Sequence, residues 1–328
     1  MKPPLLLLLS ACAFVVIIAA CDPSSRIKPG PNPGPVAGPP GGEPPIAPPI
    51  PVPKPNWAEM DAATCRSKSH PGALHLGMCS AQGMRDETDP ALSFAAGTGT
   101  PRLVKAAEKT ITGTGAIDLE RQWTKSTLRV CFFDDPHGLQ DKVMAWANRW
   151  NTVGGANLTF VKTASPQDSD IRVTFQGQGY WSYIGTVAAL PRYRGKVTMS
   201  LSFNGRPSAS ELRRVSLHEF GHAIGLVHEH QQPLAKINWN RDAVTRYFMS
   251  PPNCWSETMV RQQILNPIGG NLDTTTYDPE SIMAYGIHDS LTLDGRGTTW
   301  NTDLSPTDRN FIARVYPKPG ATPPIPPP

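Results

Sequence analysis

Two histidines and a glutamate occupy positions that a helix would bring to one metal ion. His218 and His222 are four residues apart, so on a helix their imidazoles project from the same face, one turn apart. Glu219 directly follows the first histidine and can hold a water molecule bound to the ion. Gly225 can adopt a positive φ and end the helix, which lets the chain turn and bring His228 in as a third nitrogen ligand. Three protein ligands and an open fourth position are typical of catalytic zinc, whereas structural zinc sites are closed.

The chain before this motif predicts a sheet with flanking helices. Apolar and β-branched residues predict strands at 128–133, 158–161, 171–175 and 197–203, and apolar residues at helical spacing predict an amphipathic helix at 139–150. The resulting order is strand, helix, three strands and metal-binding helix, which places the metal site at an edge of the sheet. An exposed edge strand there would hold an extended peptide by main-chain pairing, although loops could equally shield it.

The sequence around Ser208 predicts the start of the metal-binding helix. Ser208 and Glu211 have the spacing of a capping box, in which the serine side chain caps the helix and the glutamate reaches back to the serine amide. We therefore expect the helix to begin directly after the strand at 197–203.

A second motif centres on Met283, fifty-five residues after the third histidine. The run 218–228 has the pattern H-E-x-x-H-x-x-G-x-x-H of the metzincin metallopeptidases. The stretch 281–286, Ser-Ile-Met-Ala-Tyr-Gly, resembles the methionine turn that these enzymes place beneath zinc. Within the metzincins the chain looks most like the astacin group, because Glu229 follows the third histidine and Tyr285 lies two residues after the methionine.

Two further stretches carry the resemblance, which covers residues 120–317. Residues 179–185 are similar to a glycine-cysteine-aromatic-serine segment of astacins, with Tyr180 in place of the cysteine. Residues 304–308, Leu-Ser-Pro-Thr-Asp, resemble the start of the last astacin helix. Ala284 departs from the pattern, since the group usually has histidine there.

The resemblance implies an α+β fold and a peptidase activity. The fold would be a metzincin-type zincin domain with a twisted mixed sheet, two long helices and a C-terminal subdomain, over residues 119–317. The implied activity is that of a zinc-dependent metalloendopeptidase, which hydrolyses peptide or protein substrates with a zinc-activated water.

The same resemblance implies a role for each site residue. The Zn²⁺ ligands would be His218, His222 and His228. Glu219 would act as general base, and Tyr285 would stabilise the oxyanion, unless it is only a core tyrosine on a turn. Met283 would form an apolar floor beneath the metal. His230 is expected to face solvent or a loop and is not counted among the ligands.

Glu229 suggests how the enzyme is activated. In astacins the matching glutamate pairs, directly or through water, with the amino terminus formed when the pro-segment is removed. The resemblance therefore implies that a cut near residues 110–122 would activate the domain and detach it from everything N-terminal to the cut. The alternative is a glutamate that caps or bridges the turn after His228.

The N-terminus has the pattern of an export signal. Residues 1–20 contain Lys2 followed by an apolar run too short for a comfortable membrane span, and they predict a signal peptide. The run ends in Ile-Ala-Ala before Cys21, which resembles a bacterial lipobox, so we expect lipidation of Cys21 and a membrane anchor in the cell envelope. An ordinary signal peptide cut near Ala20 is the alternative. Residues 21–56 would be a tether, because fourteen of the thirty-three residues at 23–55 are prolines, which cannot build a core or a ladder.

Residues 57–118 predict an N-terminal extension or pro-region. Setting aside Cys12 and Cys21, four cysteines allow three complete pairings: Cys65, Cys79, Cys131 and Cys254. In an oxidising compartment we favour Cys65–Cys79 with Cys131–Cys254. A Cys79 thiolate on the open zinc position is a further possibility, although the surrounding residues do not match the known cysteine switch.

Composition narrows the remaining choices. The net charge of +4 on 328 residues is small and scattered, which argues against nucleic acid as a partner, and nothing indicates an oligomeric state. Residues 318–328 form a proline-rich tail without a predicted fold. Two alternatives to a peptidase are a catalytically idle zinc-containing envelope protein that binds a partner peptide in its cleft and a zinc hydrolase of non-peptide bonds. The presence of Glu219 argues against the idle protein.

Overall fold

The strands form a six-stranded mixed sheet and a separate two-stranded ribbon. The computed structural model describes residues 48–52, 54–55, 79–82, 115–177, 179–203, 205–250, 253–269, 272–274 and 276–320. The main sheet has the order β1-β6-β7-β5-β3-β4. Its strands are β1 (Cys79–Gln82), β3 (Thr127–Phe132), β4 (Thr159–Lys162), β5 (Ile171–Thr174), β6 (Tyr180–Tyr183) and β7 (Met199–Leu201). Strand β6 is antiparallel to β7, whereas the other neighbours run parallel. The ribbon pairs β2 (Ala116–Asp118) with β8 (Leu272–Thr274).

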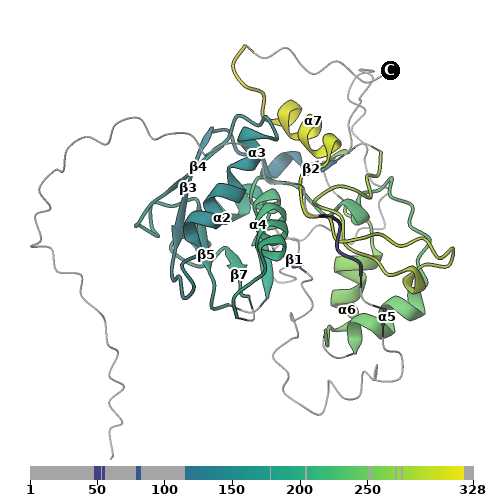
Figure 1. Cartoon of the computed structure of the whole chain (residues 1–328). Coiled ribbons are helices and arrows are strands. Elements are labelled where there is room, and N and C mark those ends of the chain that lie inside the picture. Colours follow the sequence, from purple (N-terminus) through teal and green to yellow (C-terminus); the bar gives the residue numbers. More distant parts are fainter. Residues whose placement is uncertain are drawn as a thin grey trace, which may run out of the picture. The chain divides into compact units, whose positions relative to one another are not determined.

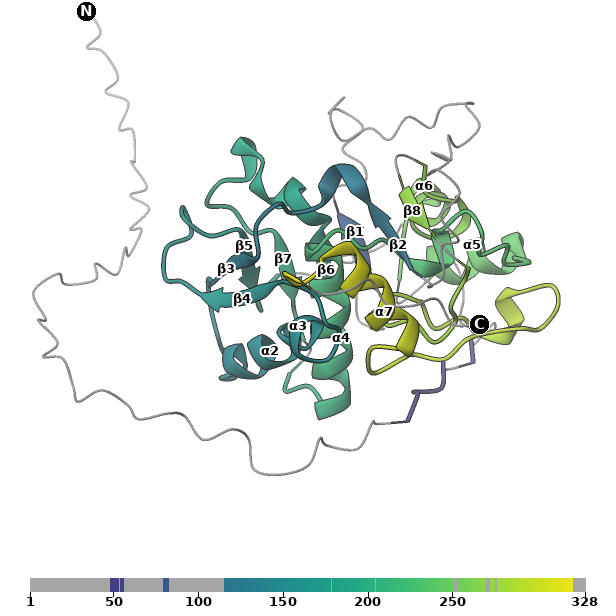
Figure 2. The same ribbon diagram turned by 90° about the horizontal axis from the view of Figure 1, so that it is seen from above.

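Helix α4 lies between strands β3, β4 and β5 and the helices α5 and α6 (Figures 1 and 2). The helices are α2 (Gln140–Ala147), α3 (Arg149–Thr152), α4 (Ala209–Ala223), α5 (Arg241–Met249), α6 (Glu257–Val260) and α7 (Pro306–Val315). Helix α4 packs against α2, β6 and β7. Trp150 is fully buried in this interface, and its indole N–H donates to the carbonyl of Leu217 at 3.0 Å. The mixed sheet and separate helices confirm the predicted α+β fold.

The predicted helix at 139–150 is divided at Asn148. The Asn148 side chain donates to the carbonyl of Phe160 at 3.1 Å and accepts from the Phe160 amide at 2.9 Å. This tie to β4 ends α2 at Ala147, and α3 begins at Arg149. The amphipathic pattern continues across the break, so the sequence alone predicts one helix.

The expected exposed edge strand beside the metal helix is covered. The sequence did not predict β6, which lies next to β7 and contacts α4. Strand β1, from the predicted pro-region, pairs with β6 in parallel over four residues on each strand, from Cys79 opposite Tyr180 to Gln82 opposite Tyr183. The main-chain edge that would hold an extended peptide is therefore occupied by a segment of the same chain.

One residue of the proline-rich segment also pairs with the domain. Ile50 and Trp300 form an antiparallel bridge with two backbone hydrogen bonds of 2.9 Å. The prediction that no residue of this segment joins a ladder is wrong at Ile50, because this residue retains its N–H between two prolines. Most of the segments predicted at 1–20, 21–56 and 57–118, and residues 321–328, lie outside the described residues. Among the described residues no helix has the length and apolarity needed to span a membrane.

The cysteines correct one predicted disulfide. Cys131 is free and buried, whereas Cys254 is disulfide-bonded. The predicted Cys131–Cys254 pair is therefore wrong, because Cys131 lies within β3 in the core of the sheet. Cys65 and the side chain of Cys79 lie outside the described residues.

Candidate metal centre

Three histidine side chains converge at the end of α4. One nitrogen of each of His218, His222 and His228 lies within 4.8 Å of the others. The Nε2 atoms of His222 and His228 are 3.1 Å apart. Gly225 makes the turn with φ +102, a backbone conformation that side-chain-bearing residues rarely adopt, and the chain then brings His228 back toward the helix. The structure thus brings together the three predicted ligands.

Each histidine is held in one tautomer by an acceptor on its Nδ1 side. The Nδ1–H of His218 donates to the carbonyl of Ile282 at 2.7 Å, and that of His222 donates to the carbonyl of Leu226 at 2.8 Å. The Nδ1–H of His228 donates to the side-chain oxygen of Gln231 at 3.2 Å. A carbonyl oxygen only accepts, so each Nδ1 carries the proton and each Nε2 presents a lone pair.

Burial keeps these imidazoles neutral. It holds the pKa of His218 and of His228 well below the ordinary value, and the neighbouring His222 lowers both further. Burial also lowers the pKa of His222, to about 4. Neutral imidazole is the form that binds a metal ion, so three buried lone pairs at this separation suit a tetrahedral zinc site with one open position.

The predicted base and the methionine turn lie against the same helix. Glu219 is 1% exposed on α4, next to His218. Met283 is buried, its carbonyl accepts from the Glu229 amide at 3.0 Å, and its side chain packs on Gly221. Because Gly221 has no Cβ, the Met283 sulfur comes closer to α4 than a larger residue would allow.

Tyr285 lies within the histidine cluster and is 1% exposed. Its ring centre is 4.4 Å from that of His228 and 4.4 Å from that of His230. The prediction that His230 faces solvent or a loop is wrong: it is 4% exposed, and its Nε2–H donates to the carbonyl of Gln263 at 3.0 Å. His230 lies beside Tyr285 because the 3₁₀ turn Glu229–Gln231 directs the His230 ring into the protein.

Glu229 is buried behind the third histidine. Its Oε1 accepts from the Asp278 amide at 2.9 Å and from the Gln232 side chain at 3.2 Å. Its Oε2 is buried without a hydrogen-bond partner among the described residues. Burial raises the pKa of Glu229 to about 8. When the group is ionised, its Oε2 can accept a further donor.

The start of the metal helix differs from its prediction. The Ser208 side chain does cap α4 by accepting from the Glu211 amide at 3.1 Å. The Glu211 carboxylate instead accepts from the Tyr180 hydroxyl at 2.9 Å, which ties α4 to β6. A reciprocal capping box occurs at Ser305 and Asp308, at the start of α7.

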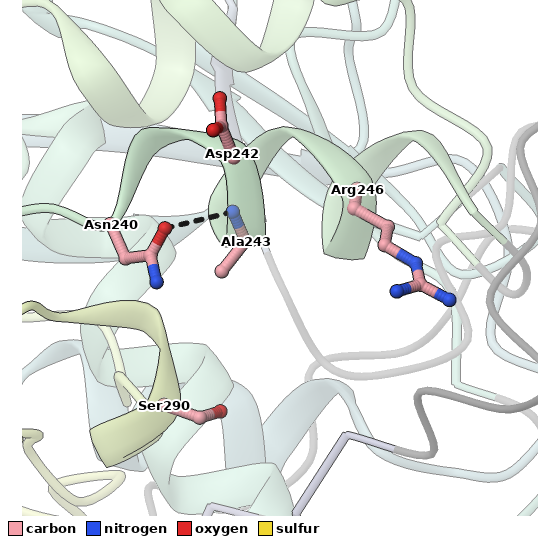
Figure 3. Close-up of a pocket in the computed structure, with 5 residues that line it drawn as sticks. All are labelled: Asn240, Asp242, Ala243, Arg246 and Ser290. Carbon is pink, nitrogen blue, oxygen red and sulfur yellow. Dashed lines mark hydrogen bonds between the residues drawn. The ribbon is translucent and has the colours of Figure 1, made fainter.

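A separate cavity of about 390 Å³ lies at the start of α5. Figure 3 shows its lining, in which Asn240 accepts from the Ala243 amide; the full set is Asn240, Asp242, Ala243, Arg246 and Ser290. None of the three histidines lines this cavity, so it is distinct from the metal centre.

One family model and several solved structures are similar to this chain. A family model described as Astacin, a peptidase family, matches residues 116–302. A solved structure of myroilysin is 37% identical, with a TM-score of 0.58, over 62% of this chain and 99% of that chain. A crystal structure of myroilysin is 36% identical (TM-score 0.46, 60% and 86% covered). High choriolytic enzyme 1, a hatching enzyme zinc-protease from Oryzias latipes (Medaka fish), is 20% identical (TM-score 0.41, 60% and 94% covered). No curated protein sequence matches this chain.

The fold and the three-histidine site define a zinc metallopeptidase of the metzincin type. The family model matches more than half of the residues of this chain, so the chain belongs to the astacin family of peptidases. It is a zinc metalloendopeptidase that acts on peptide or protein substrates. The predicted family, enzyme class and cofactor are thereby confirmed.

Proposed function

We propose that Glu219 is the general base of this endopeptidase and that Tyr285 stabilises the oxyanion. The observation that carries the proposal is the convergence of three neutral imidazole nitrogens beside a buried glutamate and a buried tyrosine. His218, His222 and His228 would hold zinc through Nε2. Met283 would serve as the floor of the site.

These side chains have separate tasks in peptide hydrolysis. Zinc, when bound, supplies a Lewis acid that lowers the pKa of a water molecule toward neutrality and polarises the peptide carbonyl. The Glu219 carboxylate takes the proton of the attacking water and passes a proton to the leaving amine. The Tyr285 hydroxyl donates a hydrogen bond to the carbonyl oxygen as negative charge develops on it.

Cleavage of an unfolded protein substrate tests these assignments. We expect Glu219→Gln to lower kcat by about 100- to 10,000-fold and Tyr285→Phe by about 100-fold, with zinc content unchanged. The matched control is Glu257→Gln, which changes an exposed glutamate on α6 and should leave kcat unaltered. Absence of chelator-sensitive cleavage in every truncated form of the chain would count heavily against these assignments.

We also propose that residues N-terminal to Ala116 are a pro-region that is removed on activation. Strand β1 pairs with the edge of β6 that would otherwise be free to hold an extended peptide, as a segment that blocks substrate binding would. In contrast, β2 is built into the domain: the Asp118 amide donates to the carbonyl of Gly225, and the Val227 amide donates to that of Ala116, both at 3.1 Å. The predicted cut lies near residues 110–122, and these contacts favour its first part, between residues 110 and 116.

The buried Oε2 of Glu229 would then receive the new amino terminus, directly or through water. Amino-terminal sequencing of active material tests the cut, and we expect a start between residues 110 and 116. Glu229→Gln should be processed at the same bond but be less active than the processed wild type. An active species that still begins at Cys21 would rule out this activation route.

The N-terminal sequence supports a further proposal, that the precursor is exported and anchored in the cell envelope by a lipid on Cys21. Processing ahead of Ala116 would release the catalytic domain from that anchor. Metabolic labelling with a fatty acid in a bacterial host should mark the precursor but not a Cys21→Ser variant. An unlabelled wild-type precursor would instead favour an ordinary signal peptide cut near Ala20.

A further inference from the structure

A single buried carboxylate on α7 holds the methionine turn. Asp308 is 4% exposed. Its Oδ1 accepts from the Ser281 hydroxyl at 2.7 Å, and its Oδ2 accepts from the Ile282 amide at 2.8 Å. The Oδ2 atom also accepts from the Ser305 amide at 2.9 Å, which completes the capping box of α7.

The residues that Asp308 holds are those that orient the metal site. Ile282 receives the Asp308 contact at its N–H, and its carbonyl accepts the Nδ1–H of His218 at 2.7 Å. The Ser281 hydroxyl accepts from the Met283 amide at 3.0 Å, and the Met283 carbonyl accepts from the amide of Glu229, the residue after His228, at 3.0 Å. Residues 281–283 are therefore anchored to α7 on one side and to His218 and the Glu229 amide on the other.

A capping role alone does not account for this arrangement. Capping α7 requires only the contacts between Ser305 and Asp308. The two remaining contacts of the carboxylate reach residues 26 and 27 positions earlier in the chain. Both go to the turn beneath the histidines.

We propose that Asp308 is a positioning residue of the metal centre. Its carboxylate fixes Ile282 so that the Ile282 carbonyl holds the His218 imidazole with Nε2 directed at the metal. Without the carboxylate, the donors of Ser281 and Ile282 lose their acceptor and the turn shifts. His218 then loses its fixed orientation. The proposal rests on the assignment of the three histidines as ligands, which the metal content of unmodified chain checks independently.

Metal release measures this role without reference to catalysis. The unprocessed chain is loaded with Zn²⁺, or with Co²⁺ as a spectroscopic probe, and transfer of the ion to a coloured chelator is followed. Loss of a partner that orients a ligand typically weakens metal binding about 10- to 100-fold. We expect Asp308→Ala to release the ion about 10 to 100 times faster and to change the Co²⁺ absorption spectrum. Asp308→Asn, which retains one acceptor oxygen, should lie between this variant and the wild type.

The matched control loosens the same helix without touching the turn. Ile312 is fully buried on α7, so Ile312→Ala should lower the melting temperature through lost packing. It should leave the release rate and the Co²⁺ spectrum unchanged. A wild-type release rate in Asp308→Ala, or an equal acceleration in Ile312→Ala, would reduce Asp308 to a structural role. If Asp308→Ala does not fold, Ser281→Ala and Asp308→Asn test the proposal by the metal release rate and the Co²⁺ spectrum. Wild-type values of both readouts in both variants would overturn the proposal.

Discussion

Replacing Gly221 with alanine tests the contact between α4 and the methionine turn. A Cβ at this position would overlap the sulfur of Met283 and would lie 3.0 Å from Cζ2 of Trp150. Both neighbours lie in the core, since Trp150 is fully buried and Met283 is 2% exposed. The Trp150 ring is also held by its hydrogen bond to Leu217, so we expect Met283 to yield.

Two opposing terms set the stability of this variant. Alanine in place of glycine in a helix interior stabilises the fold by about 1 kcal/mol. Overpacking a filled core costs about 1–3 kcal/mol. The free energy of unfolding should therefore fall by roughly 0–2 kcal/mol. Because Met283 lies beneath the histidines, its displacement should lower kcat/KM by about tenfold, which corresponds to about 1.4 kcal/mol in the activation free energy.

A double-mutant cycle with Met283→Ala isolates the contact. Urea unfolding gives the stability of each variant, and peptide cleavage by processed enzyme gives kcat/KM. In the double variant the overlap with sulfur is absent, so the cost of Gly221→Ala should be smaller than in the wild type by about 1 kcal/mol. A Gly221→Ala variant that gains the full helix-propensity increment and keeps wild-type kcat/KM would contradict the packing described here.

Four further predictions concern metal, thiol and buried charge. Chelation should abolish cleavage and lower the melting temperature, because free zinc at about 1,000 times Kd stabilises the native state by about 4 kcal/mol. Cys131 should resist alkylation until the protein unfolds, since burial raises the pKa of its thiol; mass spectrometry of native and denatured samples checks this. Arg172→Met should speed amide exchange in the segment around Lys196, whose carbonyl accepts from the Arg172 guanidinium at 2.6 Å. Asp303→Ala should cost about 3–5 kcal/mol in urea unfolding, because it removes the carboxylate that pairs with the buried Arg213.

The parts of the site that follow from local geometry were predictable from the sequence. The ligand spacing in α4 depends only on helix periodicity, and the turn at Gly225 depends on one residue's backbone freedom. Each of the four predicted strands overlaps an observed one, with boundaries that differ by one or two residues, because alternation and β-branched residues report burial directly. Prediction of the methionine turn also required the family pattern, since Ile282 and Met283 alone would indicate only residues of the hydrophobic core.

The errors arose where distant residues determine the structure. Strand β6 buries Ser182 and carries Trp181 and Tyr183 on its less buried face, so it lacks the alternation of apolar and polar residues that marks a strand in the sequence. Asn148 divides a helix through its contacts with Phe160 on a neighbouring strand. Cys131 is a free thiol within β3, although cysteine counting allowed a disulfide there. None of these contacts leaves a periodic signal.

Within the metal centre, the Nδ1 partners of the histidines also divide into local and distant ones. His222 and His228 find acceptors four and three residues away, on Leu226 and Gln231, so the segment that carries these ligands also orients them. His218 depends on a carbonyl sixty-four residues away, on Ile282. His222 and His228 can therefore be oriented as α4 and its turn form, whereas His218 acquires its fixed tautomer only when the methionine turn docks. The complete ligand set thus depends on the C-terminal part of the chain, although every ligand lies within eleven residues.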